Sequence, residues 1–157
     1  MKFKTALFWL CSLSFLGAAT AYAANTTHNK APAMTSIQVQ IGEKVFTARL
    51  DDNETAKAFA AMLPLKVDLR DLNDNEKVIE LSKKLPGEVS NPGTIRAGDL
   101  MIWSSRSLVL FYKTFPTSYS YSRLGRIEDT TGLVEAVGTG TVTVTFSKPP
   151  FLPKKIP

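Results

Sequence analysis

The chain has 157 residues, of which 44% are hydrophobic, and a formal net charge of +5 at neutral pH. This length suits one compact domain, and the charge is too small to indicate nucleic-acid binding. With a single cysteine, Cys11, the chain cannot form a disulfide of its own.

The first 23 residues have the pattern of a secretory signal peptide. Lys2 and Lys4 give a basic start, an apolar run follows from Ala6 to Leu16, and Ala21-Tyr22-Ala23 supplies a small-x-small cleavage site. The apolar run is shorter than the ~20 residues that a membrane-spanning helix needs. We therefore expect a periplasmic or secreted protein that begins at Ala24 after cleavage and has no membrane span.

Two polar segments flank the predicted domain at residues 35–147. Residues 24–34 are small and polar without periodicity, which is typical of a disordered linker. Residues 148–157, from Lys148 to Pro157, contain four prolines and three lysines and favour an extended polyproline II conformation. This tail is either solvated, or a strap across the domain, or an arm that binds a protein partner through Phe151 and Leu152.

Alternation of apolar and polar residues predicts strands through most of the domain. Residues 37–41 and 46–50 alternate on either side of Gly42-Glu43, which indicates a hairpin with one buried face. Residues 65–69 and 141–146 alternate in the same way. Residues 100–103 and 108–112 are apolar nearly throughout, as in strands that are buried on both faces.

Two segments have the pattern of short helices. The first has Asp51 as its predicted N-cap and ends before Pro64, and the second covers Thr130–Val137, with Asp129 as N-cap and Gly138 as a left-handed C-cap. The apolar residues of the first recur at helical spacing: Ala56, Phe59, Ala60 and Leu63. The fold class is therefore mainly β, a closed or nearly closed barrel with two short helices capping its ends.

The residue types exclude several classes of site. Residues 35–147 contain no cysteine and no histidine, so they cannot form His/Cys zinc sites, Cys-His nucleophiles or Ser-His-Asp triads. Residues 71–76 start like a calcium loop, but Glu76 replaces the glycine at the sixth position and Ser82 the glutamate at the twelfth. We predict a polar turn there, no metal site and no cofactor.

Aromatic and basic residues gather between residues 103 and 126. Aromatic faces with guanidinium donors suit a peptide, a proline ring or an anionic small molecule. The stretch from Phe115 to Tyr121 is predicted to be a loop, where aromatic residues favour binding. Alternatively, Trp103 and Tyr112 belong to the core and the arginines are solvated. The predicted ligand-binding residues are Trp103, Phe115, Tyr119, Tyr121, Arg123 and Arg126.

Several short motifs, taken in order, resemble the bacterial cyclophilin-like domain family. Together they cover about residues 37–147. The resemblance implies a closed, eight-stranded cyclophilin-like barrel with helices at its ends. The motifs are Ala48–Ala56 leading to Leu63-Pro64, Glu76-Lys77, Leu85-Pro86, Gly98-Asp99-Leu100 with Trp103, the strand at residues 108–112, and Leu124-Gly125-Arg126-Ile127.

The resemblance does not carry over the catalytic arginine of true cyclophilins. That arginine lies three residues before a Pro-Gly pair, and if Pro92-Gly93 is the pair, the position holds Val89. Arg96 and Arg126 are the remaining candidates for a guanidinium that would stabilise a twisting prolyl bond. We expect a non-enzymatic binding or accessory domain for a peptide or small ligand; the alternative is a weak peptidyl-prolyl cis-trans isomerase.

Overall fold

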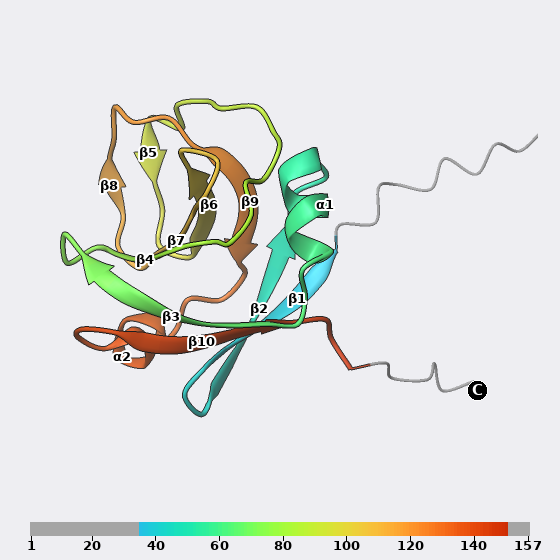
Figure 1. Ribbon diagram of the computed structural model, residues 1–157. Coiled ribbons are helices and arrows are strands. Elements are labelled where there is room, and N and C mark those ends of the chain that lie inside the picture. The colour runs from blue at the N-terminus through green and yellow to red at the C-terminus, as the bar shows by residue number, and fades with distance from the viewer. Residues whose placement is uncertain (1–34, 151–157) are drawn as a thin grey trace, which may run out of the picture. The chain divides into compact units, whose positions relative to one another are not determined.

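The computed structural model describes residues 35–150. The predicted signal peptide, the linker at residues 24–34 and residues 151–157 of the tail lie outside these residues. The described part contains ten strands and two helices, shown in Figure 1. In chain order they are β1 (Ser36–Ile41), β2 (Lys44–Leu50), α1 (Glu54–Ala60), β3 (Leu65–Leu72), β4 (Glu76–Glu80), β5 (Thr94–Ile95), β6 (Asp99–Trp103), β7 (Ser107–Phe111), β8 (Phe115–Pro116), β9 (Ser122–Ile127), α2 (Leu133–Val137) and β10 (Val142–Ser147).

Eight strands close into an antiparallel barrel, which confirms the predicted fold class. Their order around the barrel is β1-β10-β3-β4-β7-β6-β9-β2. The predicted hairpin joins β1 to β2, and Val39 lies opposite Phe46 in it. On its other side β1 pairs with β10, where Val39 lies opposite Phe146 and Ile41 opposite Val144, so the last strand closes the barrel.

The two helices cover opposite ends of the barrel. Phe59 of α1 packs edge-on against Phe146 near the end of β10, with ring centroids 5.5 Å apart. Leu133 and Val137 of α2 are buried in the same apolar core, a few residues before β10 begins. β10 begins shortly after α2, and its other end packs against α1. Apolar side chains of the two helices therefore close the interior of the barrel at both ends.

The predicted cap of the first helix is wrong. Asn53 is the N-cap, and its side-chain oxygen accepts a hydrogen bond from the Ala56 amide at 2.8 Å. The Asp51 carboxylate instead accepts a hydrogen bond from Arg123 at 3.0 Å. The asparagine lies directly before the first helical residue, where a side-chain acceptor can reach the free amides of the first turn.

The second helix is shorter than predicted. It begins at Leu133 after Gly132, which has no side-chain cap, rather than at Thr130. The Asp129 carboxylate is used in a local turn, where it accepts a hydrogen bond from the Thr131 amide at 2.9 Å. Gly138 does end the helix with a positive φ of 54°, although its ψ of −162° lies outside the predicted left-handed region.

A second apolar core lies outside the barrel wall and positions the candidate site. The small sheet of β5 and β8 covers the outer faces of β4, β6 and β7 (Figure 1). The inner faces of these strands belong to the barrel core, so β6 and β7 are buried on both faces as predicted. The outer core consists of Val78, Ile95, Met101, Val109, Phe111 and Tyr121.

Candidate functional site

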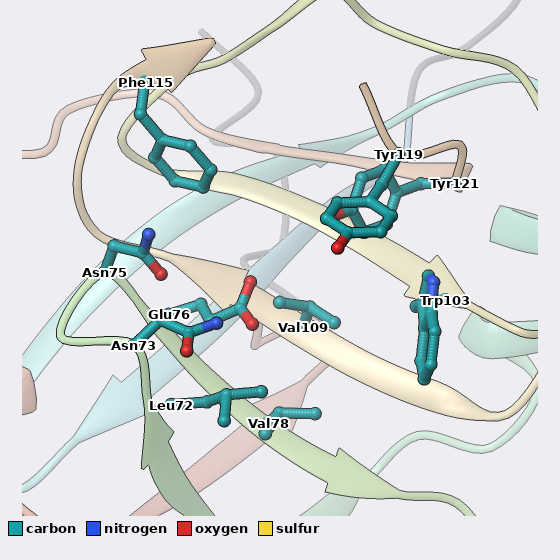
Figure 2. A pocket seen from close by; sticks show the side chains of 10 residues that line it. All are labelled: Leu72, Asn73, Asn75, Glu76, Val78, Trp103, Val109, Phe115, Tyr119 and Tyr121. Atoms are coloured by element: carbon teal, nitrogen blue, oxygen red, sulfur yellow. The ribbon is translucent and has the colours of Figure 1, made fainter. Parts of the chain in front are cut away.

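A cavity of about 230 Å³ lies on the outer face of the barrel, beside the second core. Its floor comes from β4 and β7, and its walls come from the end of β6, the turn before β4 and residues 115–121. Figure 2 shows the side chains that surround it. They are Leu72, Asn73, Asn75, Glu76, Val78, Trp103, Val109, Phe115, Tyr119 and Tyr121. We call this cavity the aromatic pocket.

Four aromatic side chains surround the pocket to different depths. Tyr121 is buried and packs edge-on against Phe111 of β7, with ring centroids 5.6 Å apart. Phe115 lies 5.8 Å from the same ring and is half-buried. Trp103 and Tyr119 are 49% and 65% exposed, respectively, which is unusual for large rings that line a cavity. The inner pair fixes the wall, and the outer pair is free to contact a ligand.

Backbone pairing holds residues 115–121 over the barrel wall. Ile95 of β5 lies opposite Phe115 of β8. Farther along, Ser90 and Tyr121 exchange two backbone hydrogen bonds of 3.0 and 2.9 Å, and the Thr117 amide donates to Gly93 at 2.9 Å. The predicted loop is therefore fastened at three points by the segment that precedes β6. This fixed backbone places Tyr119 at the pocket.

The polar side of the pocket comes from the turn between β3 and β4. Asn73 and Asp74 adopt left-handed conformations with φ of 56° and 52°, which reverse the chain and bring Asn75 and Glu76 to the pocket. The Glu76 carboxylate points toward the middle of the cavity in Figure 2. The Oδ1 atom of Asn75 is buried and has no hydrogen-bond partner within residues 35–150.

Electrostatics favour proton retention on this side of the pocket. Burial raises the pKa of Glu76; the charge of Arg70 opposes this effect, and the charge of Asp71 adds to it. Burial also raises the pKa of Tyr121, and the nearby Glu76 carboxylate contributes to that shift. A negative charge placed here is therefore poorly compensated by the surrounding protein.

The structure brings four of the six predicted ligand-binding residues together and separates the other two. Trp103, Phe115, Tyr119 and Tyr121 all line the aromatic pocket, whereas Arg123 and Arg126 do not. Tyr112 is buried in the barrel core, as the alternative proposed, but the exposure of Trp103 excludes a core position for it.

Each separated arginine faces an acidic neighbour. Arg123 lies 3.0 Å from Asp51 and lines a different hollow beside α1. Arg126 lies 3.7 Å from the buried carboxylate of Asp99, which is its partner across β6 and β9. The side chains of Arg123 and Arg126 are 40% and 45% exposed, respectively.

The candidate isomerase residues also lie apart from the aromatic pocket. Val89, which replaces the catalytic arginine in the resemblance, is 62% exposed. The side chain of Arg96 is exposed, and its backbone amide donates to Asp99 at 2.8 Å. Neither residue, nor Arg126, is among the residues that line the pocket.

The residues that sequence analysis missed come from the turn and the strands under the pocket. Glu76 and Asn75 fell in a segment predicted only to be a polar turn, and a turn is indeed present. One signal was available: Glu76 and Val78 are two residues apart and therefore share one face of a strand. That face lines the pocket, while Lys77 points to the other side of the wall.

Residues 35–150 contain no group of three or more side chains that could hold a metal ion. In the same part of the chain, no helix is both long and apolar enough to cross a membrane.

Comparison with known proteins identifies the family. No curated protein matches the chain. Among solved structures, a hypothetical protein from Archaeoglobus fulgidus, determined in solution, is 17% identical and has a TM-score of 0.48; the match covers 74% of this chain and 95% of that one. A family model described as the cyclophilin-like family matches residues 39–147, which is nearly the whole barrel. The chain therefore belongs to the cyclophilin-like family.

Proposed function

We propose that this protein is an exported, non-enzymatic binding domain that takes a short peptide or small molecule in the aromatic pocket. Export rests on the pattern of the first 23 residues. The binding role rests on one observation: Trp103 at the end of β6 and three aromatic residues between Phe115 and Tyr121 converge on a single cavity.

The exposure of the outer rings supports binding. Trp103 and Tyr119 leave large apolar surfaces in water, and a ligand that covers them gains roughly 25 cal/mol for each Å² of apolar area removed from water. Tryptophan and tyrosine are also common anchors of binding surfaces. Phe115 and Tyr121 are held by packing against Phe111, so the pocket is formed before a ligand arrives.

The size of the pocket limits what it can hold. Its volume of about 230 Å³ lies below the range of roughly 300–1,000 Å³ that is typical of small-molecule sites. One side chain of a peptide, or a small molecule of similar size, fits this space. The rest of a longer ligand would lie along the exposed rim at Trp103 and Tyr119.

The test is an NMR titration of labelled protein with a short peptide that contains one Xaa-Pro bond. We expect shifts of the Trp103 indole and of residues 115–121, with loss of the shifts in Trp103→Ala and Tyr119→Ala. Val45→Ala is the matched control, because Val45 is 56% exposed on β2 and does not line the pocket. Unchanged shifts in both pocket variants would exclude this site.

The same titration tests the isomerase alternative. Faster exchange between the cis and trans peptide signals would indicate catalysis, and its loss in Arg96→Ala or Arg126→Ala would identify the guanidinium responsible. Neither arginine lines the aromatic pocket, so we expect peptide shifts without faster exchange.

A further inference from the structure

We propose that the aromatic pocket selects ligands that carry an organic cation with N–H donors, either a primary alkylammonium or a guanidinium. This inference rests on the proposed function, because it names the chemical class of the ligand for the same pocket. Three features carry it: the charge of the lining, an unpaired acceptor and the aromatic walls.

The first feature is the charge of the lining. Of the ten residues around the pocket, Glu76 is the only one with a charged side chain, and no lysine or arginine is among them. Glu76 also forms no ion pair within the described chain, although five other carboxylates do: Asp51, Asp52, Asp71, Asp99 and Glu128. A half-buried carboxylate without a partner favours a cation.

The second feature is the free acceptor beside this carboxylate. The buried Oδ1 atom of Asn75 has no donor among residues 35–150, and leaving a buried acceptor unpaired is destabilising. In Figure 2 the Asn75 amide and the Glu76 carboxylate lie on the same side of the cavity. Two neighbouring acceptors match a group with several N–H donors. A quaternary ammonium cannot satisfy them, because it has no hydrogen to donate.

The third feature is the aromatic wall opposite these acceptors. The faces of aromatic rings carry partial negative charge and attract cations within about 6 Å. Trp103, Tyr119, Tyr121 and Phe115 surround the cavity together with the apolar side chains of Leu72 and Val109. This lining suits a short hydrocarbon chain that ends in a charged group.

The same geometry removes the basis for an anionic ligand. The sequence is compatible with an anionic small molecule if Arg123 and Arg126 lie beside the aromatic residues. Both arginines lie outside the pocket next to Asp51 and Asp99, respectively, so their donors are directed elsewhere. An anion in the pocket would meet Glu76, and no lining residue carries a positive charge to compensate.

The experiment compares probes of equal length that differ in their head group. The full chain is titrated with butylammonium, butylguanidinium, 1-butanol, butanoate and butyltrimethylammonium, and binding is followed by the NMR signals of Trp103 and of residues 115–121. We expect the first two probes to bind at least about tenfold more tightly than the other three.

Two matched variants on one strand test the role of the carboxylate. Glu76→Gln keeps the shape of the side chain and should weaken butylammonium binding by about tenfold or more without changing 1-butanol binding. Glu80→Gln changes an exposed carboxylate on the same strand β4 and should change neither. Circular dichroism of both variants establishes that they are folded.

Several results would overturn the inference without touching the proposed function. If 1-butanol or butyltrimethylammonium binds as tightly as butylammonium, or if Glu76→Gln binds butylammonium as the unmodified protein does, the pocket does not select such cations. If Tyr119→Ala then abolishes binding of the probe, the probe still binds in the aromatic pocket and the proposed function stands. If no probe binds, the inference is also overturned, while the Xaa-Pro peptide titration decides the proposed function independently.

Discussion

Lys77 and Asp71 lie directly opposite one another on β4 and β3 and form an ion pair in which the ammonium group is completely buried. The Lys77 ammonium also donates to the carbonyl oxygens of Gly138 and Gly140 at 2.9 and 2.7 Å. All three of its donors are therefore used. One buried charge thus joins the β3–β4 hairpin to the segment that links α2 to β10.

Replacing this lysine should destabilise the fold strongly. Lys77→Met removes the charge but keeps a long side chain, and it leaves the Asp71 carboxylate and two carbonyl groups without their donor. We expect the free energy of unfolding in urea to fall by about 3 kcal/mol. Lys84→Met, at an exposed position, should change it by less than ~0.5 kcal/mol. Similar effects of the two substitutions would contradict a structural role for the buried ammonium.

The same ion pair predicts a loss of stability in acid. The hydrogen bond from Lys77 lowers the pKa of Asp71 below its ordinary value of 3.8; burial opposes this shift, and the hydrogen bond from Tyr112 adds to it. A carboxyl whose pKa is lower in the folded state stabilises the fold above its unfolded pKa, and this contribution is lost as the pH falls through the folded pKa. Urea unfolding over roughly pH 5 to pH 2 should show a shallower decline for Asp71→Asn than for the unmodified protein. Parallel declines would count against this assignment.

Tyr112 should remain protonated throughout the neutral and mildly alkaline range. Burial raises its pKa to about 12, and the hydrogen bond that its hydroxyl donates to Asp71 adds to the shift. In a spectrophotometric titration, one tyrosine should ionise at a higher pH than the others, and Tyr112→Phe should remove that last step. A late step that persists in Tyr112→Phe would assign it to another tyrosine.

The ionised Glu76 carboxylate should lower the stability of the fold at neutral pH, although it should support ligand binding. Its pKa is raised by burial first, against the effect of Arg70 and with that of Asp71, and the pocket also places Tyr121 near it. A carboxyl with a raised folded pKa stabilises the fold below its unfolded pKa, and this contribution is lost as the pH rises through the folded pKa. Glu76→Gln should therefore be more stable than the unmodified protein at pH ~7, with the difference vanishing in acid. A less stable variant at neutral pH would refute this prediction.

Gly125 is required where β9 approaches β2. Its φ is +153°, and a Cβ atom there would overlap the Arg49 carbonyl oxygen and lie 2.7 Å from the Leu50 Cα atom. Because both neighbours are backbone, Gly125→Ala should lower the free energy of unfolding by about 3 kcal/mol or more. Gly42→Ala, with a φ of +60° and open space around the position, should lower it by only about 1 kcal/mol. Equal losses would mean that the close approach is unimportant.

Much of the barrel could be predicted because its apolar periodicity is local. The hairpin of β1 and β2, and the strands β3, β6, β7 and β10, contain the predicted residues except Tyr112, which follows β7, and Thr141, which precedes β10. β4 could not be predicted in the same way, since Lys77 stands where an apolar residue is expected. The acceptors that allow its burial include Gly138 and Gly140, which lie 61 and 63 residues away in sequence.

The aromatic part of the site was accessible from sequence, but its polar part was not. Phe115, Tyr119 and Tyr121 stand out because a loop has no interior of its own to fill. Arg126 follows shortly after these residues in the sequence, but the pairing of β6 with β9 places it opposite Asp99. Glu76 reaches the pocket only through the pairing of β4 with β7, where it lies opposite Phe111.

The alternation along β4 places residues that line the pocket and a residue that stabilises the barrel on opposite faces of the strand. Glu76 and Val78 face the aromatic pocket, whereas Lys77 between them holds the barrel together. On β7, Val109 faces the pocket, while Leu108 and Leu110 belong to the barrel core. Substitution of Glu76 would therefore change what the domain recognises, while substitution of the inward residues would change whether it folds. Val78 and Val109 also belong to the second apolar core, so those positions tolerate only apolar replacements. A lineage that keeps the inward residues can acquire new ligands without rebuilding its barrel.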